Sequence, residues 1–187
     1  MPSIQEIRLQ LQQLATNEAK ASFEKFVPGS QKVYGVRMPL VNDLAKTLKH
    51  EAGIPFIKSL WKSGSFEEKI LAAKLVNKIA KKHAAESIAL VSAFAHDIRD
   101  WAVCDTLGMQ SLKPIAATHS KEIFELAHQL KSSEDMWQRR LSLVLVEVYT
   151  KNKSLHPQIN ALIRYHEKDR EYYVKKAVAW LKRNMKK

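Results

Sequence analysis

Apolar residues recur every three to four positions along most of the chain, and this spacing predicts amphipathic helices. In the segment 66–83, three apolar residues fall on one face of a helix and three lysines on another. The apolar residues are Leu71, Leu75 and Ile79, and the lysines are Lys74, Lys78 and Lys81. No segment shows the convincing alternation of a strand, so we expect an all-α fold with the apolar faces buried.

Start and stop signals divide this pattern into separate helices. Ser3 and Ser65 are placed to cap helices, Pro39 suits a first helical turn, and Pro28-Gly29 ends the helix before it. The expected helices cover residues 3–16, 17–26, 39–50, 54–62, 65–83, 85–97, 101–112, 119–131, 135–151, 155–165 and 170–185.

Alternate helices begin with the same pattern, an aromatic residue shortly after a polar or acidic one. The aromatic residues are Phe66, Trp101, Trp137 and Tyr173, at intervals of 35, 36 and 36 residues. A period of this size accommodates two helices and two turns, as in HEAT repeats. We therefore expect residues 1–187 to form a single domain, a right-handed solenoid of HEAT-like helix pairs. The alternative is a chance recurrence of aromatic residues near helix starts.

Positive charge is in large excess, with 31 lysines and arginines against 19 acidic residues, a net charge of +12 and a pI near 9.8. This balance indicates a polyanionic partner, nucleic acid in preference to an anionic membrane. In a solenoid the aligned helices line the concave side, and three of them carry clustered lysines or arginines. We expect a basic concave face that follows a phosphate backbone. For any one helix, a solvated face is the alternative.

Cysteine content and apolar runs bear on the location of the protein. Cys104 is the only cysteine, which excludes an intramolecular disulfide and a cysteine-rich zinc motif. The first residues lack the basic and apolar regions of a signal peptide, and no apolar run approaches the roughly 20 residues of a membrane-spanning helix. We expect a cytoplasmic protein without membrane contact.

Asp105 is the most informative candidate for chemistry, because it is a carboxylate flanked by apolar residues inside a helix. A partly desolvated carboxylate costs free energy unless it is paired, and Arg140 is a candidate partner for Asp105 or for a phosphate. Asp100 is expected to be the N-cap of the same helix. A structural salt bridge accounts for Asp105 as well as a functional role does.

Three tryptophans and two arginines complete the candidate set. They are Trp101, Trp137, Trp180, Arg139 and Arg140. Tryptophans at helix starts often belong to the core between repeats, and for Trp137 we keep that interpretation. The two arginines are also compatible with a solvated surface pair.

Four segments of the chain form a set when taken in order and spacing. They are Val33–Pro39, Trp101–Asp105, Trp137–Arg140 and Tyr172–Trp180. They match a Gly-Val-x-x-Pro turn, a Trp-x-x-x-Asp pattern, a Trp-x-x-Arg pattern and an aromatic-rich segment around Lys-Ala, the last being the most specific. Together, over roughly residues 23–183, they resemble the DNA alkylation repair family, alkylpurine DNA glycosylases built from HEAT-like repeats.

The resemblance implies duplex DNA containing purines alkylated at N3 or N7 as the substrate. Such a base is cationic, so its glycosidic bond is already weak and the leaving group needs no proton. The enzyme must stabilise positive charge on the sugar and deliver a water molecule. No metal or organic cofactor is implied.

The matching positions give each candidate a role. Asp105 corresponds to the catalytic carboxylate, and electron-rich rings attract a cationic base or sugar. Phe26 lies nine residues before Gly35, where the family can place an aromatic ring against DNA. The expected set is Asp105 as catalytic residue, Trp101, Trp180 and Phe26 as substrate-binding residues, and Arg139, Arg140, Lys175 and Lys176 as phosphate-binding residues.

The leading hypothesis is a monomeric DNA glycosylase that hydrolyses the N-glycosidic bond of these cationic purines. One alternative is a DNA-binding module of the same fold, without catalysis, for damaged or branched DNA. Another is a HEAT-type protein scaffold with an acidic partner. The presence of Asp105 favours the first hypothesis, and the basic charge argues against the third.

Overall fold

The structure is a computed structural model that describes residues 2–29, 32–50 and 53–186, and these residues form helices without any strand. The helices are α1 (Ile4–Leu14), α2 (Asn17–Phe26), α3 (Met38–Thr47), α4 (Ile54–Lys62), α5 (Phe66–Ile79), α6 (Ala84–Phe94), α7 (Trp101–Gln110), α8 (Ser120–Leu130), α9 (Met136–Val144), α10 (His156–His166) and α11 (Tyr172–Met185). The expected all-α fold is confirmed. None of the helices described is long and apolar enough to cross a membrane.

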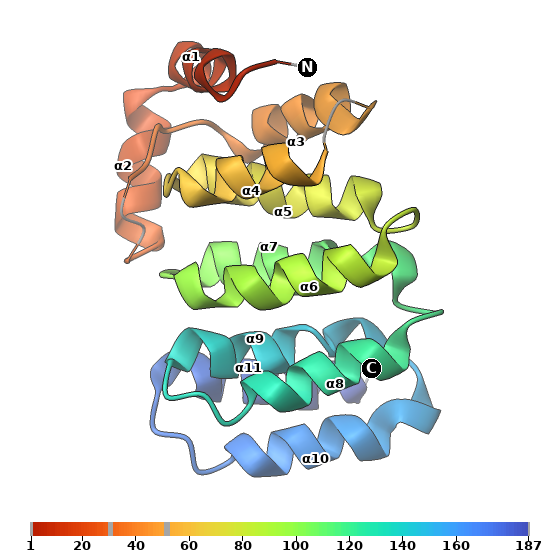
Figure 1. Cartoon of the computed structure of the whole chain (residues 1–187). Helices are drawn as coiled ribbons and strands as arrows, with labels where there is room; N and C mark the ends of the chain where they lie inside the picture. Colours follow the sequence, from red (N-terminus) through yellow and green to blue (C-terminus); the bar gives the residue numbers. More distant parts are fainter. Residues whose placement is uncertain (1, 30–31, 51–52, 187) are drawn as a thin grey trace.

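From α4 onward the helices stack in two rows (Figure 1). In one row α5, α7, α9 and α11 contact one another in that order. The other row contains α4, α6, α8 and α10, with α4 against α5, α8 against α9 and α10 against α11. At the N-terminal end α3 packs on α5 and α1 on α4. The helices of each row are thus stacked in the order in which they occur in the chain, and side chains on successive helices of one row lie close together.

The helix starts follow the predicted capping residues. Ser3 accepts a hydrogen bond from the backbone N–H of Glu6, whose carboxylate accepts from the N–H of Ser3. Ser65 and Asp100 each accept from a backbone N–H in the first turn of α5 and α7. These bonds satisfy N–H groups that lack a partner within the helix, which is why polar residues before an apolar run locate helix starts well.

The largest differences from the predicted helix ends are at α5, which ends at Ile79, and at α9, which ends at Val144. After Val144 the chain continues in a 3-10 helix, Glu147–Tyr149. The hydroxyl of Tyr149 donates to the carbonyl of Ala116 at 2.9 Å and fixes this tighter turn against the preceding helix pair. After Val144 the apolar residues Leu145 and Val146 remain buried, so there the apolar spacing continues beyond the end of the α-helix. After Ile79 only Ala80 is buried, and Lys81 and Lys82 are exposed.

The core extends through the whole stack, from Ile7 in α1 to Leu181 in α11. On α5 the predicted apolar face is buried, with Leu71 and Leu75 fully inaccessible. Lys69 of the same helix is also buried, and its Nζ donates to the carbonyl of Asp97 at 2.6 Å. The positive charge of α5 is therefore shared between the interior and the surface.

Candidate active site

A carboxylate–guanidinium pair joins three helices of one row. Arg140 of α9 donates from Nε to Oδ1 of Asp105 on α7 at 3.0 Å and from Nη2 to Oδ2 at 2.9 Å. Its Nη1 donates to the backbone carbonyl of Tyr173 on α11 at 2.6 Å. The Arg140 side chain is 8% exposed and that of Asp105 is 22% exposed. The pair is therefore held in a fixed, largely desolvated geometry, with Asp105 as the more accessible partner.

The environment makes Asp105 less acidic than a solvated carboxyl. Burial raises its pKa and is the larger influence, while the hydrogen bonds and the charge of Arg140 act in the opposite direction. The net direction is upward. A carboxylate with a raised pKa gains more from a positive charge placed beside it than a well-hydrated one does, because fewer water dipoles compete.

Trp101 lies at the first turn of α7, four residues before Asp105 and half-buried. Its indole Nε1 donates to the carbonyl of Phe26 at the end of α2, at 3.1 Å. Gly29 holds the following turn close to α7, since a Cβ at this position would lie 2.4 Å from the carbonyl oxygen of Arg99. Figure 1 shows α2 running across the ends of the stacked helices, which brings its last residues to the level of α7.

Two hollows meet at Trp101. The first, the aromatic hollow, has a volume of about 480 Å³ and is lined by Lys25, Phe26, Pro28, Trp101, Arg140, Tyr172, Tyr173 and Lys176. The second, the carboxylate hollow, has a volume of about 340 Å³ and is lined by Phe23, Val27, Met38, Asn42, Phe66, Ile70, Lys74, Trp101, Ala102, Asp105, Thr106 and Gln110. The Asp105–Arg140 pair lies between them, with one partner lining each hollow.

The aromatic hollow combines exposed rings with cations. Phe26 and Tyr172 are 63% and 57% exposed, which is unusual for large apolar side chains. The Nζ of Lys25 lies 5.2 Å from the centre of the Phe26 ring, and the Nζ of Lys176 lies 4.9 Å from that of Tyr172. Exposed rings beside ammonium groups suit ligands that combine flat bases with phosphates.

The structure brings five of the predicted site residues together around Trp101. They are Phe26, Trp101, Asp105, Arg140 and Lys176. Lys175 is exposed in the first turns of α11, next to this group but outside the lining of both hollows. Trp180 is half-buried, packs against the core and also lies outside that lining, two turns along α11 from Tyr173.

Arg139 lies apart from the others and is engaged in the structure of the neighbouring loops. Its Nε donates to Asp169 at 2.7 Å, and its Nη1 donates to the carbonyls of Ser133 and Glu134 at 2.9 and 2.7 Å. The Arg139 side chain is 18% exposed. These bonds join the loop before α9 to the loop before α11, and the guanidinium does not line either hollow.

Sequence reasoning missed the buried carboxylate that shapes the turn before α3. Glu67 accepts hydrogen bonds from the backbone N–H groups of Tyr34, Gly35 and Val36 at 3.0, 2.7 and 3.0 Å. Gly35 has φ +97°, and a Cβ there would lie 2.6 Å from the carbonyl oxygen of Thr16. These contacts explain the Gly-Val part of the first motif. The available signal was a pair of acidic residues, Glu67 and Glu68, in the first turn of the long amphipathic helix α5.

No group of three or more histidine, cysteine, aspartate or glutamate side chains that could hold a metal ion occurs in the part of the chain that the structure describes. The polar chemistry of the two hollows is therefore that of one carboxylate, one guanidinium, several lysines and side-chain amides. Such a set can stabilise a cation at Asp105 and anions at the lysines.

The fold and the site together define a class of protein, an all-helical stack in which exposed rings and cations lie around a partly buried carboxylate. A family model described as DNA alkylation repair enzyme matches residues 7–187. The chain therefore belongs to the DNA alkylation repair enzyme family, and the resemblance carried by the four sequence motifs is confirmed. None of the curated proteins matches the chain.

Proposed function

We propose that this protein is a DNA glycosylase that hydrolyses the N-glycosidic bond of N3- and N7-alkylated purines in duplex DNA. The observation that carries the proposal is the oriented carboxylate of Asp105 beside the ring of Trp101, at the meeting point of two hollows. Membership of a family of DNA alkylation repair enzymes supports the same reaction class.

The chemistry follows from the charge of the lesion. An alkylated purine carries a positive charge, so it leaves with the electron pair of the C1′–N bond as a neutral base. Positive charge then grows on the sugar, where the carboxylate of Asp105 stabilises it more than in the ground state. Water adds to C1′ and loses a proton to the carboxylate or to solvent. The ring of Trp101 offers a second, electron-rich surface to the cationic base or sugar.

Arg140 has two roles in this proposal. Its bidentate bonds fix both oxygens of Asp105. A guanidinium has five N–H donors, and three of them serve the bonds to Asp105 and Tyr173. Because Arg140 lines the aromatic hollow, we propose that a donor not used in these bonds contacts a phosphate at its edge. Arg140 is therefore proposed both to orient Asp105 and to contact a phosphate.

The remaining predictions have unequal support. Lys175 and Lys176 are exposed on α11 and are proposed to contact phosphates, while the engagement of Arg139 with Asp169 makes it a weaker candidate. The role of Trp180 rests on the family motif. We further propose that residues 1–187 act as one monomeric domain, a right-handed solenoid of HEAT-like pairs. Its basic concave face would be formed by the row of α5, α7, α9 and α11.

One observation favours a second candidate function, a DNA-binding module without catalysis. Both oxygens of Asp105 already accept hydrogen bonds from Arg140, as in a purely structural salt bridge. If the pair only joins α7 to α9, the aromatic hollow and the lysines still bind DNA, but no base is released.

The deciding experiment measures release of N7-methylguanine from a methylated duplex with protein in excess. We expect the wild type to release the base and Asp105→Asn to be slower by on the order of 100-fold or more. DNA binding by Asp105→Asn should be retained or tighter, because a negative charge near phosphates is lost. The matched control is Glu125→Gln, which makes the corresponding carboxylate-to-amide change at an exposed glutamate of α8, outside the lining of the hollows.

Each result has a clear meaning, provided that circular dichroism shows Asp105→Asn to be folded. Full activity in Asp105→Asn would overturn the proposed mechanism. No release by either protein, together with tight binding of the duplex, would establish the non-catalytic function. Loss of release in Glu125→Gln as well would show that the assay responds to charge in general and not to the site.

A further inference from the structure

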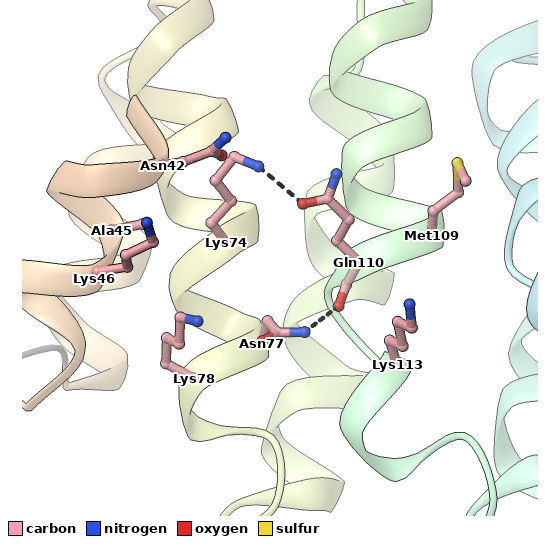
Figure 2. A pocket seen from close by; sticks show the side chains of 9 residues that line it. All are labelled: Asn42, Ala45, Lys46, Lys74, Asn77, Lys78, Met109, Gln110 and Lys113. Carbon is pink, nitrogen blue, oxygen red and sulfur yellow. Dashed lines mark hydrogen bonds between the residues drawn. The ribbon is translucent and has the colours of Figure 1, made fainter. Parts of the chain in front are cut away.

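A third space, here called the lysine pocket, adjoins the carboxylate hollow, and Figure 2 shows the side chains that line it. It has a volume of about 560 Å³, and no acidic residue is among the described residues that line it. Its four lysines are Lys46 from α3, Lys74 and Lys78 from α5, and Lys113 just after α7. Lys74 also lines the carboxylate hollow, so the two spaces adjoin.

The charge of the lysine pocket is only partly neutralised. Lys46 forms an ion pair with Asp43 at 2.7 Å, outside the lining. Lys78 and Lys113 are exposed and form no ion pair with any residue that the structure describes. Burial lowers the pKa of Lys74, and the nearby Lys78 lowers it further. An anion in the pocket would relieve this repulsion, because it would interact favourably with all these ammonium groups.

The wall of the pocket is fixed by hydrogen bonds around Gln110. The Nζ of Lys74 donates to Oε1 of Gln110 at 2.8 Å, and Nδ2 of Asn77 donates to its backbone carbonyl at 2.5 Å. Figure 2 shows both bonds crossing from α5 to the end of α7. Lys74 is thereby held in one position and keeps N–H donors that the bond to Gln110 does not use.

We propose that the lysine pocket binds a backbone phosphate of the damaged strand and sets the register in which the sugar of the lesion lies over Asp105. The inference rests on the proposed function and adds a contact that orients the substrate. Lysine ammonium groups are point charges that accept a phosphate from several directions. Free phosphate has the same chemistry, but the continuity with the carboxylate hollow favours a strand that passes through both.

The first test is the salt dependence of binding to a short unmodified duplex. We expect Lys78→Ala/Lys113→Ala to reduce the slope of log K against log salt by about 0.9, the contribution of one phosphate contact. The control, Lys121→Ala/Lys153→Ala, removes two exposed lysines elsewhere and should change the slope much less. Equal changes in both variants, or no change in the first, would overturn the proposal.

The second test locates the phosphate. Single phosphates around one N7-methylguanine are replaced by neutral methylphosphonates, and binding is measured in the Asp105→Asn background so that the base stays attached. We expect one position or two adjacent positions to weaken binding severalfold, and this effect to vanish at those positions in Lys78→Ala/Lys113→Ala. Unchanged sensitivity at every position would refute the assignment of register.

Two further outcomes distinguish the phosphate contact of the lysine pocket from the binding of a free anion and from the proposed glycosylase function. If pyrophosphate binds through Lys78 and Lys113 while the slope for the duplex stays the same, the pocket serves a free anion and the inference is overturned. If the slope falls as expected but the wild type releases no base, the proposed glycosylase function fails and the phosphate contact stands.

Discussion

Two carboxylates at the start of α7 meet different environments although they are only five residues apart. Asp100 is 3% exposed and accepts a hydrogen bond from the N–H of Val103 at 2.8 Å, as the N-cap of the helix. Asp105 is held by the guanidinium of Arg140. Burial raises the pKa of Asp100 to about 6, and its backbone hydrogen bonds offset only part of the effect. One carboxylate is thus caged within the fold, while the other has a cationic partner and an open side.

The raised pKa of Asp100 predicts a pH-dependent stability. A carboxyl whose pKa is higher in the folded state contributes most to stability in acid, and this contribution is lost as pH rises from about 4 through about 6. Near neutral pH the charged form costs on the order of 3 kcal/mol. Asp100→Asn keeps a capping oxygen without the charge, so we expect it to increase the free energy of unfolding near pH 7. Urea unfolding of both proteins measures the difference.

The same comparison near pH 4 provides the control, because Asp100 is then largely protonated in the folded wild type and Asn should bring little gain. A stability difference that is the same at both pH values would show that the carboxylate is not destabilised by its burial. Activity under both conditions should follow Asp105 instead, whose raised pKa means that base release declines in acid as the carboxylate becomes protonated.

Arg139 and Arg140 show what a residue pattern can and cannot predict. They are neighbours of the same type in one motif, yet one binds Asp169 in a loop and the other binds Asp105 in the site. Successive residues on a helix point about 100° apart, so their partners depend on how the neighbouring helices pack. The sequence shows that Arg140 follows Trp137 by three residues, but the packing of the helices decides which carboxylate its guanidinium meets.

At the scale of elements, the close approach of α7 to α9 depends on one glycine. A Cβ at Gly108 would lie 2.6 Å from Cγ1 of Val144. We expect Gly108→Ala to separate the two helices locally and to lower the free energy of unfolding by about 1–3 kcal/mol. Because Asp105 and Arg140 lie one turn away on the same two helices, the distances between them should also change, and base release should fall. Single-turnover rates and urea unfolding measure the two effects.

A second substitution tests the cause. Val144→Ala removes the methyl group nearest to the new Cβ, at 2.6 Å, and leaves Cβ of Val144 and Cδ1 of Leu141 at 3.0 Å. Gly108→Ala/Val144→Ala should therefore recover part of the activity that Gly108→Ala loses. Val144→Ala alone leaves a cavity and lowers stability, but it should leave the Asp105–Arg140 pair in place. Additive losses in the double variant would mean that the spacing of α7 and α9 does not control the site.

Helix starts were predictable from the sequence because caps such as Ser3 and Ser65 act within a few residues of themselves. The ends of α5 and α9 were not: buried residues continue past Val144 into a 3-10 helix, and the lysines after Ile79 belong to a turn although they fit the helical spacing. The contact between Trp101 and Phe26 spans 75 residues and depends on how α2 crosses the stack. The chemical groups of the site were therefore visible in the sequence, but the two hollows that they line were not.

At the scale of the whole molecule, the hydrogen bond from Trp101 to Phe26 ties the N-terminal helices to the middle of the stack. Trp101→Phe keeps an aromatic ring but removes the indole N–H. We expect amide hydrogen exchange to become faster within α2, while α9 and α11 keep their protection, because stacked helices depend mainly on their neighbours. Trp61→Phe is a suitable control, since it removes a buried indole N–H that has no hydrogen-bond partner among the residues that the structure describes. Unchanged exchange in α2 would show that other contacts hold it.

The stacking of α5, α7 and α9 sets the distance between the lysine pocket and the Asp105–Arg140 pair. Three lysines of the lysine pocket lie on α5 and just after α7, and the Asp105–Arg140 pair joins α7 to α9. Helix α7 therefore contributes to both sites. A change in the curvature of the stack would move the lysine pocket relative to the Asp105–Arg140 pair and leave the contacts within each site intact. We therefore expect a variant with altered curvature to keep its affinity for DNA and an intact Asp105–Arg140 pair, yet to place the wrong nucleotide over Asp105.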